Sequence, residues 1–174
     1  ALLRDVVKAD LDAGDFPLVI GGDHSIAVGT IAGVVQHLRP KGEELGVIWF
    51  DAHGDFNTPE TSRSGNVHGM PLAACLGYGA KELTDLAGFT MLKPENVALI
   101  GIRELDKEER VLIKKSGVKV FTMHDIDRDG MAAVVAEALE IVTTGTAGFH
   151  MSFDLDGCDP EVAPGVGTPV PGGV

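Results

Sequence analysis

The chain has 174 residues, of which 44% are hydrophobic and 23% are charged. This length provides for one domain with a hydrophobic core, and the composition is that of an ordered protein rather than of a disordered tail. The formal net charge of −12, without any cluster of Lys and Arg, argues against a nucleic-acid partner and suits a small cationic substrate.

Apolar runs of strand length alternate with segments of helical periodicity. In chain order, the expected elements are a helix over residues 2–13, a strand over 16–20, a helix over 25–38, strands over 46–50 and 97–101, a helix over 107–116, a strand over 118–121, a helix over 130–143 and a strand over 148–153. The strands are apolar throughout, as in sheets covered on both faces. Each helix is long enough for a crossover connection. This pattern predicts an α/β fold with a central, mostly parallel sheet in a single domain over residues 1–174.

Two signals concern the ends of these elements. Gly117 stands where the residue after a helix belongs, and Asp125 or Asp127 is expected to cap the helix over residues 130–143. The absence of an initiator Met and the Gly-rich end at residues 171–174 suggest a piece of a longer protein.

Cysteine usage and hydropathy indicate the compartment. Cys75 and Cys158 are far apart and lack metal-site spacing, so both are expected to be buried free thiols in a reducing environment. No apolar run is long enough to cross a bilayer, and no signal peptide precedes the first predicted helix. A cytoplasmic protein without a membrane partner is therefore expected.

Chemistry-bearing residues follow four of the five predicted strands. In open parallel sheets, ligands bind beyond the carboxyl ends of the strands, so these motifs should meet at one edge. They are Gly21-Gly22-Asp23-His24-Ser25, Asp51-Ala52-His53-Gly54-Asp55, Arg103-Glu104-Leu105-Asp106 and Asp154-Leu155-Asp156-Gly157. Only the strand that ends near Met123 leads into an ordinary capped turn.

The spacing within two of these motifs brings side chains together. Alternate residues of an extended chain point to the same side, so Asp154 and Asp156 should converge. Asp51 and Asp55 would lie roughly 13 Å apart in a fully extended chain, too far for one ion. The chain must therefore bend between them, and Gly54 is expected to permit that bend.

The four aspartates among these residues predict bound metal. Carboxylates gathered at buried strand ends repel one another and lose hydration, at a cost of several kcal/mol per ion, and no Lys or Arg is expected to compensate. Two divalent cations would compensate. An oxygen-rich ligand set with two imidazoles and no thiolate favours Mn²⁺, with Fe²⁺, Co²⁺ and Zn²⁺ as open alternatives. A single Asp-X-Asp is more commonly a turn, and only the conjunction of clusters indicates metal.

Three of these segments resemble the signatures of the ureohydrolase family, which includes arginases and agmatinases. They are residues 21–25, 51–55 and the longer run Ser152-Phe153-Asp154-Leu155-Asp156-Gly157-Cys158-Asp159-Pro160, in which Cys158 stands where many relatives have Leu. The resemblance extends through the whole chain but covers only the middle of a family member. It implies a three-layer α/β/α, arginase-like fold, truncated at both ends, with a dimanganese site at the sheet edge.

The resemblance also implies a ligand set for two Mn²⁺ ions per subunit. One ion would be held by His24, Asp51, Asp55 and Asp154. The other would be held by Asp51, His53, Asp154 and Asp156, so that Asp51 and Asp154 bridge the two ions.

Residues 55–71 resemble arginases rather than agmatinases, and Bacillus-type arginases in particular. By this resemblance, an amino-acid substrate would meet neutral donors at its carboxylate and an acidic acceptor at its ammonium. The implied substrate contacts are Asn57, Ser64 and Asn66 for the carboxylate, Asp106 with Glu109 behind it for the ammonium, and Thr168.

The implied reaction is hydrolysis of L-arginine to L-ornithine and urea by a metal-bridging hydroxide. Asp55 would steady the hydroxide, and His68 would shuttle the proton. The acidic residue that grips the guanidinium in this family would lie beyond Val174, and the full-length protein would be a homotrimer or homohexamer. Alternatives are a hydrolase of agmatine or of another guanidino acid, and a non-catalytic metal-binding fragment.

Overall fold

The computed structural model describes residues 1–174, and the chain forms two compact units. The first unit comprises residues 1–45 and 55–93, and the second comprises residues 46–54 and 94–174. None of the helices has both the length and the apolar character that crossing a membrane requires.

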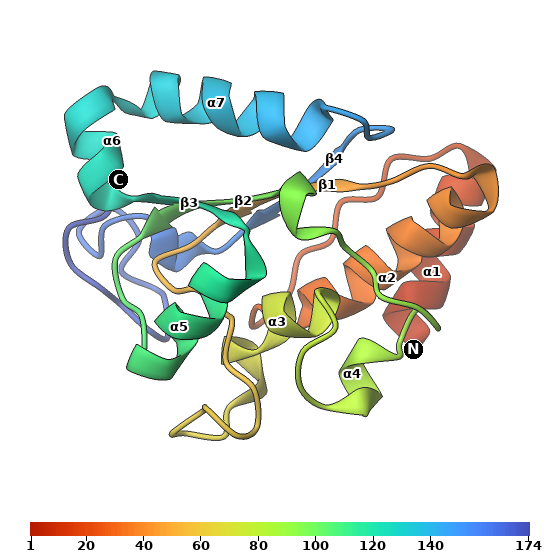
Figure 1. Cartoon of the computed structure of the whole chain (residues 1–174), viewed down its shortest axis with the longest axis horizontal. Coiled ribbons are helices and arrows are strands. Elements are labelled where there is room, and N and C mark those ends of the chain that lie inside the picture. The colour runs from red at the N-terminus through yellow and green to blue at the C-terminus, as the bar shows by residue number, and fades with distance from the viewer. The chain divides into compact units, whose positions relative to one another are not determined.

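The first unit is helical. Its helices are α1 (Leu2–Ala13), α2 (Ile26–Leu38), α3 (Pro71–Cys75) and α4 (Lys81–Thr84), with 3₁₀ turns η1 (Arg39–Lys41) and η2 (Val67–Gly69). Helices α1 and α2 pack side by side, as Figure 1 shows. Their contact is close at Gly33, where an added Cβ would lie 2.7 Å from the carbonyl oxygen of Arg4. Only glycine permits this approach, because any side chain would meet backbone there.

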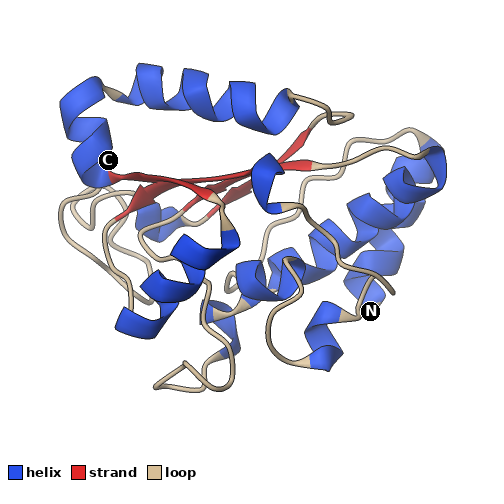
Figure 2. Cartoon of the chain, in the orientation of Figure 1, coloured by secondary structure: helices blue, strands red, loops and turns tan.

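The second unit contains every strand of the chain, all in one parallel sheet of order β3-β2-β1-β4 (Figure 2). The strands are β1 (Gly46–Phe50), β2 (Val97–Ile102), β3 (Lys119–Thr122) and β4 (Phe149–Phe153). The remaining elements are α5 (Lys107–Ser116), α6 (Met123–Asp129), α7 (Met131–Thr143) and the 3₁₀ turns η3 (Pro94–Asn96) and η4 (Leu155–Gly157). Every residue of β1 and β2 is buried, as their unbroken apolar sequences predict.

Helices lie on both sides of this sheet. Figure 1 shows α7 along one face and α5 on the opposite side. The core under α6 and α7 joins alternate strand residues to the apolar stripes of these helices, and it comprises Ile48, Phe50, Ala98, Ile100, Phe121, Ile126, Val134, Ala138 and Val142. Burying each large side chain contributes roughly 1.5–3 kcal/mol to stability. The parallel α/β architecture predicted from the sequence is confirmed.

Four of the five predicted strands are confirmed, and the strand predicted over residues 16–20 is wrong. This segment is irregular, and Phe16, Leu18 and Ile20 are 92%, 79% and 86% exposed. A parallel strand exists only when its backbone N–H and C=O groups pair with a neighbour. The segment pairs with none of the four strands, so its apolar sequence alone does not make it a strand.

The four predicted helices are confirmed, but the predicted cap of the last one is wrong. Asp125 belongs to a capping box at the start of α6, where its carboxylate accepts from the Thr122 N–H at 2.8 Å. Helix α7 begins after Gly130 without a side-chain cap. Because α6 has only seven residues, it is too short to show helical periodicity in the sequence. Gly117 does end α5, in the left-handed conformation predicted for it.

Exposed apolar side chains predict that the 174 residues expressed alone will self-associate. Besides residues 16–20, the edge strand β4 exposes Phe149, Met151 and Phe153 by 42–52%. Exposed apolar edges recruit further strands. Leu18→Lys combined with Met151→Lys should reduce self-association in light scattering, whereas Val111→Lys, at an exposed valine of α5, should not. A monodisperse, monomeric unmodified chain would contradict this expectation.

Candidate metal centre

The carboxylate of Asp51 is buried directly after β1. Its backbone N–H continues the sheet pairing by donating to the carbonyl of Ile100 at 3.1 Å, and only 1% of the residue is exposed. One carboxylate oxygen accepts from Trp49 Nε1 at 3.1 Å, and the other accepts from the His53 backbone N–H at 2.7 Å. The Asp51 carboxylate is thus oriented by β1 and by the turn that follows this strand.

The loop after β4 brings a second buried carboxylate to Asp51. Asp154 Oδ1 accepts from the Asp156 N–H at 3.0 Å, which starts the turn η4. Asp156 is 2% exposed, and its two carboxylate oxygens accept from the Ala52 N–H at 3.2 Å and from the Thr168 hydroxyl at 2.7 Å. Ala52 precedes His53, so this contact joins the two acidic turns.

Asp51, His53 and Asp156 form a cluster whose ligand atoms lie within 4.8 Å of one another. His53 Nδ1 is 3.3 Å from Asp51 Oδ1 and 3.1 Å from Asp156 Oδ2. An ion with bonds of roughly 2.0–2.2 Å holds neighbouring ligand atoms roughly 3 Å apart, so these three side chains fit around one divalent ion. Asp154 is not one of these three residues, and its Oδ1 accepts from the Asp156 N–H.

The His53 imidazole balances the two carboxylates electrostatically. Burial by itself would lower the pKa of His53, but hydrogen bonds with Asp156 and Asp51 outweigh burial and raise that pKa to about 10. The cluster therefore stabilises a positive charge between two buried negative ones. A divalent cation provides the same compensation more strongly.

The first unit contains a second carboxylate–imidazole pair. Asp23 Oδ1 accepts from the Ser25 N–H at 2.9 Å and from its hydroxyl, which shapes the turn that leads into α2. The intervening His24 is buried, and its Nδ1 lies 3.1 Å from Asp55 Oδ2. The carbonyl of Asp55 accepts from the N–H groups of Leu72 and Ala73. The start of α3 therefore fixes the backbone that presents Asp55.

The predicted bend between Asp51 and Asp55 is present at Ala52 and His53, but the role predicted for Gly54 is wrong. The left-handed residue is Asp55, with φ 49°, and Gly54 does not have a positive φ. Glycine is required at position 54 for space instead, because an added Cβ would lie 2.7 Å from Leu105 and 2.8 Å from both Glu109 and Ile113. Aspartate tolerates the left-handed region better than most residues, at some cost in conformational energy.

The predicted substrate residues of the first unit share the loop between Asp55 and α3. Asn57 is buried, its N–H donates to the Gly69 carbonyl at 3.0 Å, and its side-chain oxygen accepts from the Thr61 hydroxyl at 2.9 Å. Ser64 and Asn66 are exposed and are joined by a hydrogen bond from the Asn66 N–H to the Ser64 hydroxyl at 3.2 Å. His68 is half-buried in η2. The loop thus holds its own shape through local hydrogen bonds.

Asp106 and Glu109 stand at the start of α5. They form a capping box, in which Glu109 Oε2 accepts from the Asp106 N–H at 3.0 Å. Glu109 is 4% exposed. Capping accounts for both residue types, so their contact with substrate stays a prediction.

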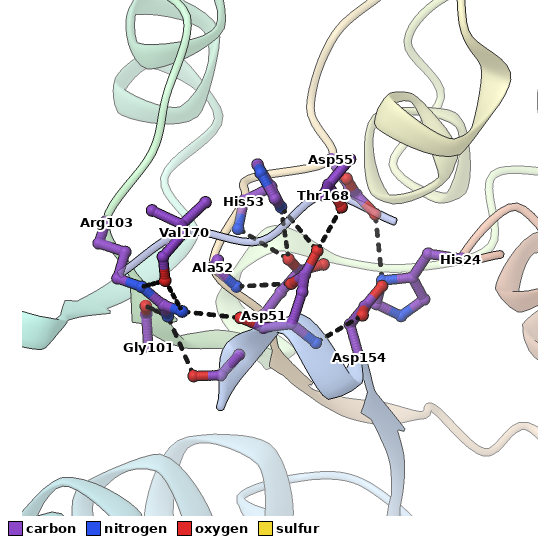
Figure 3. Close-up of polar contacts among 12 residues, drawn as sticks. His24, Asp51, Ala52, His53, Asp55, Gly101, Arg103, Asp154, Thr168 and Val170 are labelled. Carbon is purple, nitrogen blue, oxygen red and sulfur yellow. Dashed lines mark hydrogen bonds and ion pairs between the residues drawn. The ribbon is translucent and has the colours of Figure 1, made fainter. Parts of the chain in front are cut away.

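Arg103 belongs to one of the predicted motifs, but the sequence analysis assigned it no role. Its guanidinium donates to the carbonyls of residues 101, 156, 157, 158 and 170, of which Figure 3 labels Gly101 and Val170. All of these acceptors are backbone carbonyls, and none is a carboxylate of the acidic motifs. The available signal was the place of Arg103, directly after β2 at the edge where the acidic motifs gather.

Comparison with known proteins identifies the family. The arginase family model matches residues 1–174, and the chain is 60% identical over 173 residues to an arginase of Brevibacillus brevis. The chain belongs to the arginase family. The solved structure of Bacillus caldovelox arginase matches with a TM-score of 0.95 at 55% identity, covering 99% of this chain and 57% of that one. An Entamoeba histolytica arginase solved in complex with L-ornithine matches with a TM-score of 0.91 at 45% identity, covering 99% and 57%.

The arginase-family match is extensive for this chain and partial for its relatives. The alignment with the Brevibacillus arginase covers 99% of this chain but 57% of that protein. The chain therefore spans little more than half the length of this relative.

Metal affinity of this arginase-family cluster should depend on pH through His53. A pKa of about 10 means that His53 is protonated at neutral pH without metal, whereas a metal ligand must be the neutral imidazole. Mn²⁺ binding should therefore release a proton, and affinity should rise by up to roughly tenfold per pH unit below the pKa. Calorimetry in buffers of different ionisation enthalpy measures this release. His53→Asn should reduce it, and an equal release by both proteins would contradict the expectation.

Proposed function

We propose that the protein to which this chain belongs is an arginase, which hydrolyses L-arginine to L-ornithine and urea with two Mn²⁺ ions per subunit. The cluster of Asp51, His53 and Asp156 within an arginase-family chain carries this proposal. An alternative role as a non-catalytic metal-binding fragment would give no function to the loop that carries Asn57, Ser64, Asn66 and His68.

The proposed ligand set uses both carboxylate–imidazole groups. His24, Asp51, Asp55 and Asp154 hold one ion, and Asp51, His53, Asp154 and Asp156 hold the other. The pairing of His24 with Asp55 supports the first site, and the cluster around His53 supports the second. Because Asp55 follows Asp51 by four residues, we further propose that both units belong to a single ureohydrolase domain.

When bound, the two ions supply a water molecule that is nucleophilic at neutral pH. Asp55 would orient this nucleophile toward the guanidinium carbon of L-arginine, since its backbone carbonyl is held by the start of α3 and its carboxylate pairs with His24. His68 delivers the proton that the departing ornithine amine requires, because an imidazole can act as a general acid.

Substrate selection is assigned to groups around the metal ligands. Asn57, Ser64 and Asn66 bind the α-carboxylate with neutral donors, and Asp106 with Glu109 attracts the α-ammonium. Thr168 lies at the site itself, because its hydroxyl donates to Asp156. The net charge of −12 favours approach of a cationic substrate.

A cytoplasmic location is proposed from the state of the two cysteines. Cys75 and Cys158 are both free, Cys75 fully buried and Cys158 only partly, as suits a reducing cytoplasm. A homotrimer or homohexamer is proposed for the complete protein on the family resemblance alone.

Replacing a shared ligand should lower metal content and turnover together. Asp154→Asn in the complete protein removes a negative charge that both ions would share, so bound Mn²⁺ and urea release should each fall by at least tenfold. Metal analysis and a urea assay measure the two effects. Asp159→Asn provides a matched control, because the Asp159 carboxylate accepts only backbone hydrogen bonds from residues 161, 172 and 173. Undiminished turnover of a metal-free Asp154→Asn protein would refute the dimanganese proposal.

The complete protein should strongly prefer L-arginine over agmatine, which lacks the carboxylate. Each polar group left unpaired by agmatine costs roughly 1–3 kcal/mol, or about 5- to 150-fold in kcat/KM. Asn66→Ala should narrow the preference, whereas Ser62→Ala, in the same loop, should leave it unchanged because Ser62 accepts from Gly65 instead. Equal kcat/KM values for the two substrates would favour the rival assignment to another guanidino hydrolase.

A further inference from the structure

Arg103 is surrounded by backbone carbonyls. Its Nη2 donates to the carbonyls of Asp156 at 2.7 Å, Cys158 at 3.1 Å and Val170 at 2.7 Å. Its Nη1 donates to the carbonyls of Gly157 at 3.0 Å and Gly101 at 3.3 Å, and its Nε donates to Val170 at 3.1 Å. A guanidinium has five N–H groups in a fixed plane, so these contacts use its whole donor capacity.

These carbonyls belong to the two segments that position the Asp156 carboxylate. Residues 156–158 form and end the turn η4 that carries Asp156 itself. Val170 lies two residues after Thr168, whose hydroxyl donates to Asp156 Oδ2 at 2.7 Å. Arg103 therefore binds both the backbone of a metal-ligand candidate, Asp156, and the backbone near Thr168, the side chain that orients it; Figure 3 shows Arg103 beside Val170.

The charge of Arg103 also acts on this acidic loop. None of its acceptors is a carboxylate, so the charge is not cancelled by a direct ion pair. N–H donors of Glu161 and Gly172 chiefly lower the pKa of Asp159, and the charge of Arg103 adds to that effect. The same charge opposes repulsion between Asp154 and Asp156 before any ion binds.

We propose that Arg103 is a positioning residue that sets the Mn²⁺ affinity of the site formed by Asp51, His53 and Asp156, and does so selectively. It acts through the backbone that holds Asp156 and not by touching metal or substrate. The inference rests on the proposed dimanganese function. Arg103 donates only to backbone carbonyls of residues 101, 156, 157, 158 and 170, so metal binding at the His24–Asp55 pair provides an internal reference.

Arg103→Lys separates geometry from charge. Lysine retains the positive charge, but its single ammonium cannot span residues 156–158 and Val170 as a planar fork does. If the hydrogen-bond geometry of Arg103 sets the metal affinity, Arg103→Lys should weaken Mn²⁺ binding although it keeps the positive charge. Arg103→Gln, which retains two N–H donors and loses the charge, tests the complementary case.

The test is a Mn²⁺ titration of the metal-free complete protein, followed by the electron paramagnetic resonance signal of the free ion. The unmodified protein should bind two ions. Arg103→Lys should weaken one of them by roughly 10- to 100-fold, the usual effect of losing a residue that supports metal ligands, and leave the other unchanged. Arg128→Lys is the matched control, because Arg128 forms only surface ion pairs with Asp125 and Asp129.

Each alternative outcome decides against a different claim. Two ions bound with unmodified affinity by Arg103→Lys, or both weakened equally, would overturn the positioning role. Failure of both the Lys and the Gln variant to fold would also overturn it, because Arg103 would then serve the fold as a whole. An unmodified protein that binds no Mn²⁺ would instead defeat the proposed function.

Discussion

Two carboxylates, those of Asp51 and Asp156, are almost completely buried beside one another at the edge of the sheet, with exposures of 1% and 2%. Buried charges of like sign are unfavourable unless hydrogen bonds and opposite charge compensate them. Here N–H groups of Trp49, Ala52 and His53 supply the hydrogen bonds, together with the Thr168 hydroxyl. The positive charge comes from the His53 imidazolium, or from a metal ion in its place.

This compensation requires that β1 lie between β2 and β4. In that order, the parallel register sends the chain out of all three strands at one edge, so that Asp51, Arg103 and Asp154 emerge together. The N–H of Asp154 donates to the carbonyl of Phe50, which continues the sheet into the site. The parallel pairing of β1 with β2 and β4 therefore sets the spacing between these strand ends.

Backbone groups account for much of the precision of the site. Two N–H groups of α3 donate to the carbonyl of the left-handed Asp55. At Asp156, the Ala52 N–H donates to the carboxylate and Arg103 donates to the backbone carbonyl. Such contacts orient carboxylates without adding side-chain freedom. In an arginase, they would keep the ligand set arranged before the ions bind, which lowers the ordering cost of binding.

The sequence by itself determined the buried strands β1 and β2, the four long helices and the acidic motifs at the strand ends. These features depend on apolar periodicity and on short motifs, both of which are local. It also determined the family, because residues 21–25, 51–55 and 152–160 are specific together. The tertiary structure alone decided that residues 16–20 form no strand, that Asp55 and not Gly54 has the left-handed conformation, and that Arg103 binds carbonyls. The reason is that such outcomes depend on partners distant in sequence: Arg103 and Asp156 are 53 positions apart, Ala52 and Asp156 are 104 apart, and no local pattern specifies either contact.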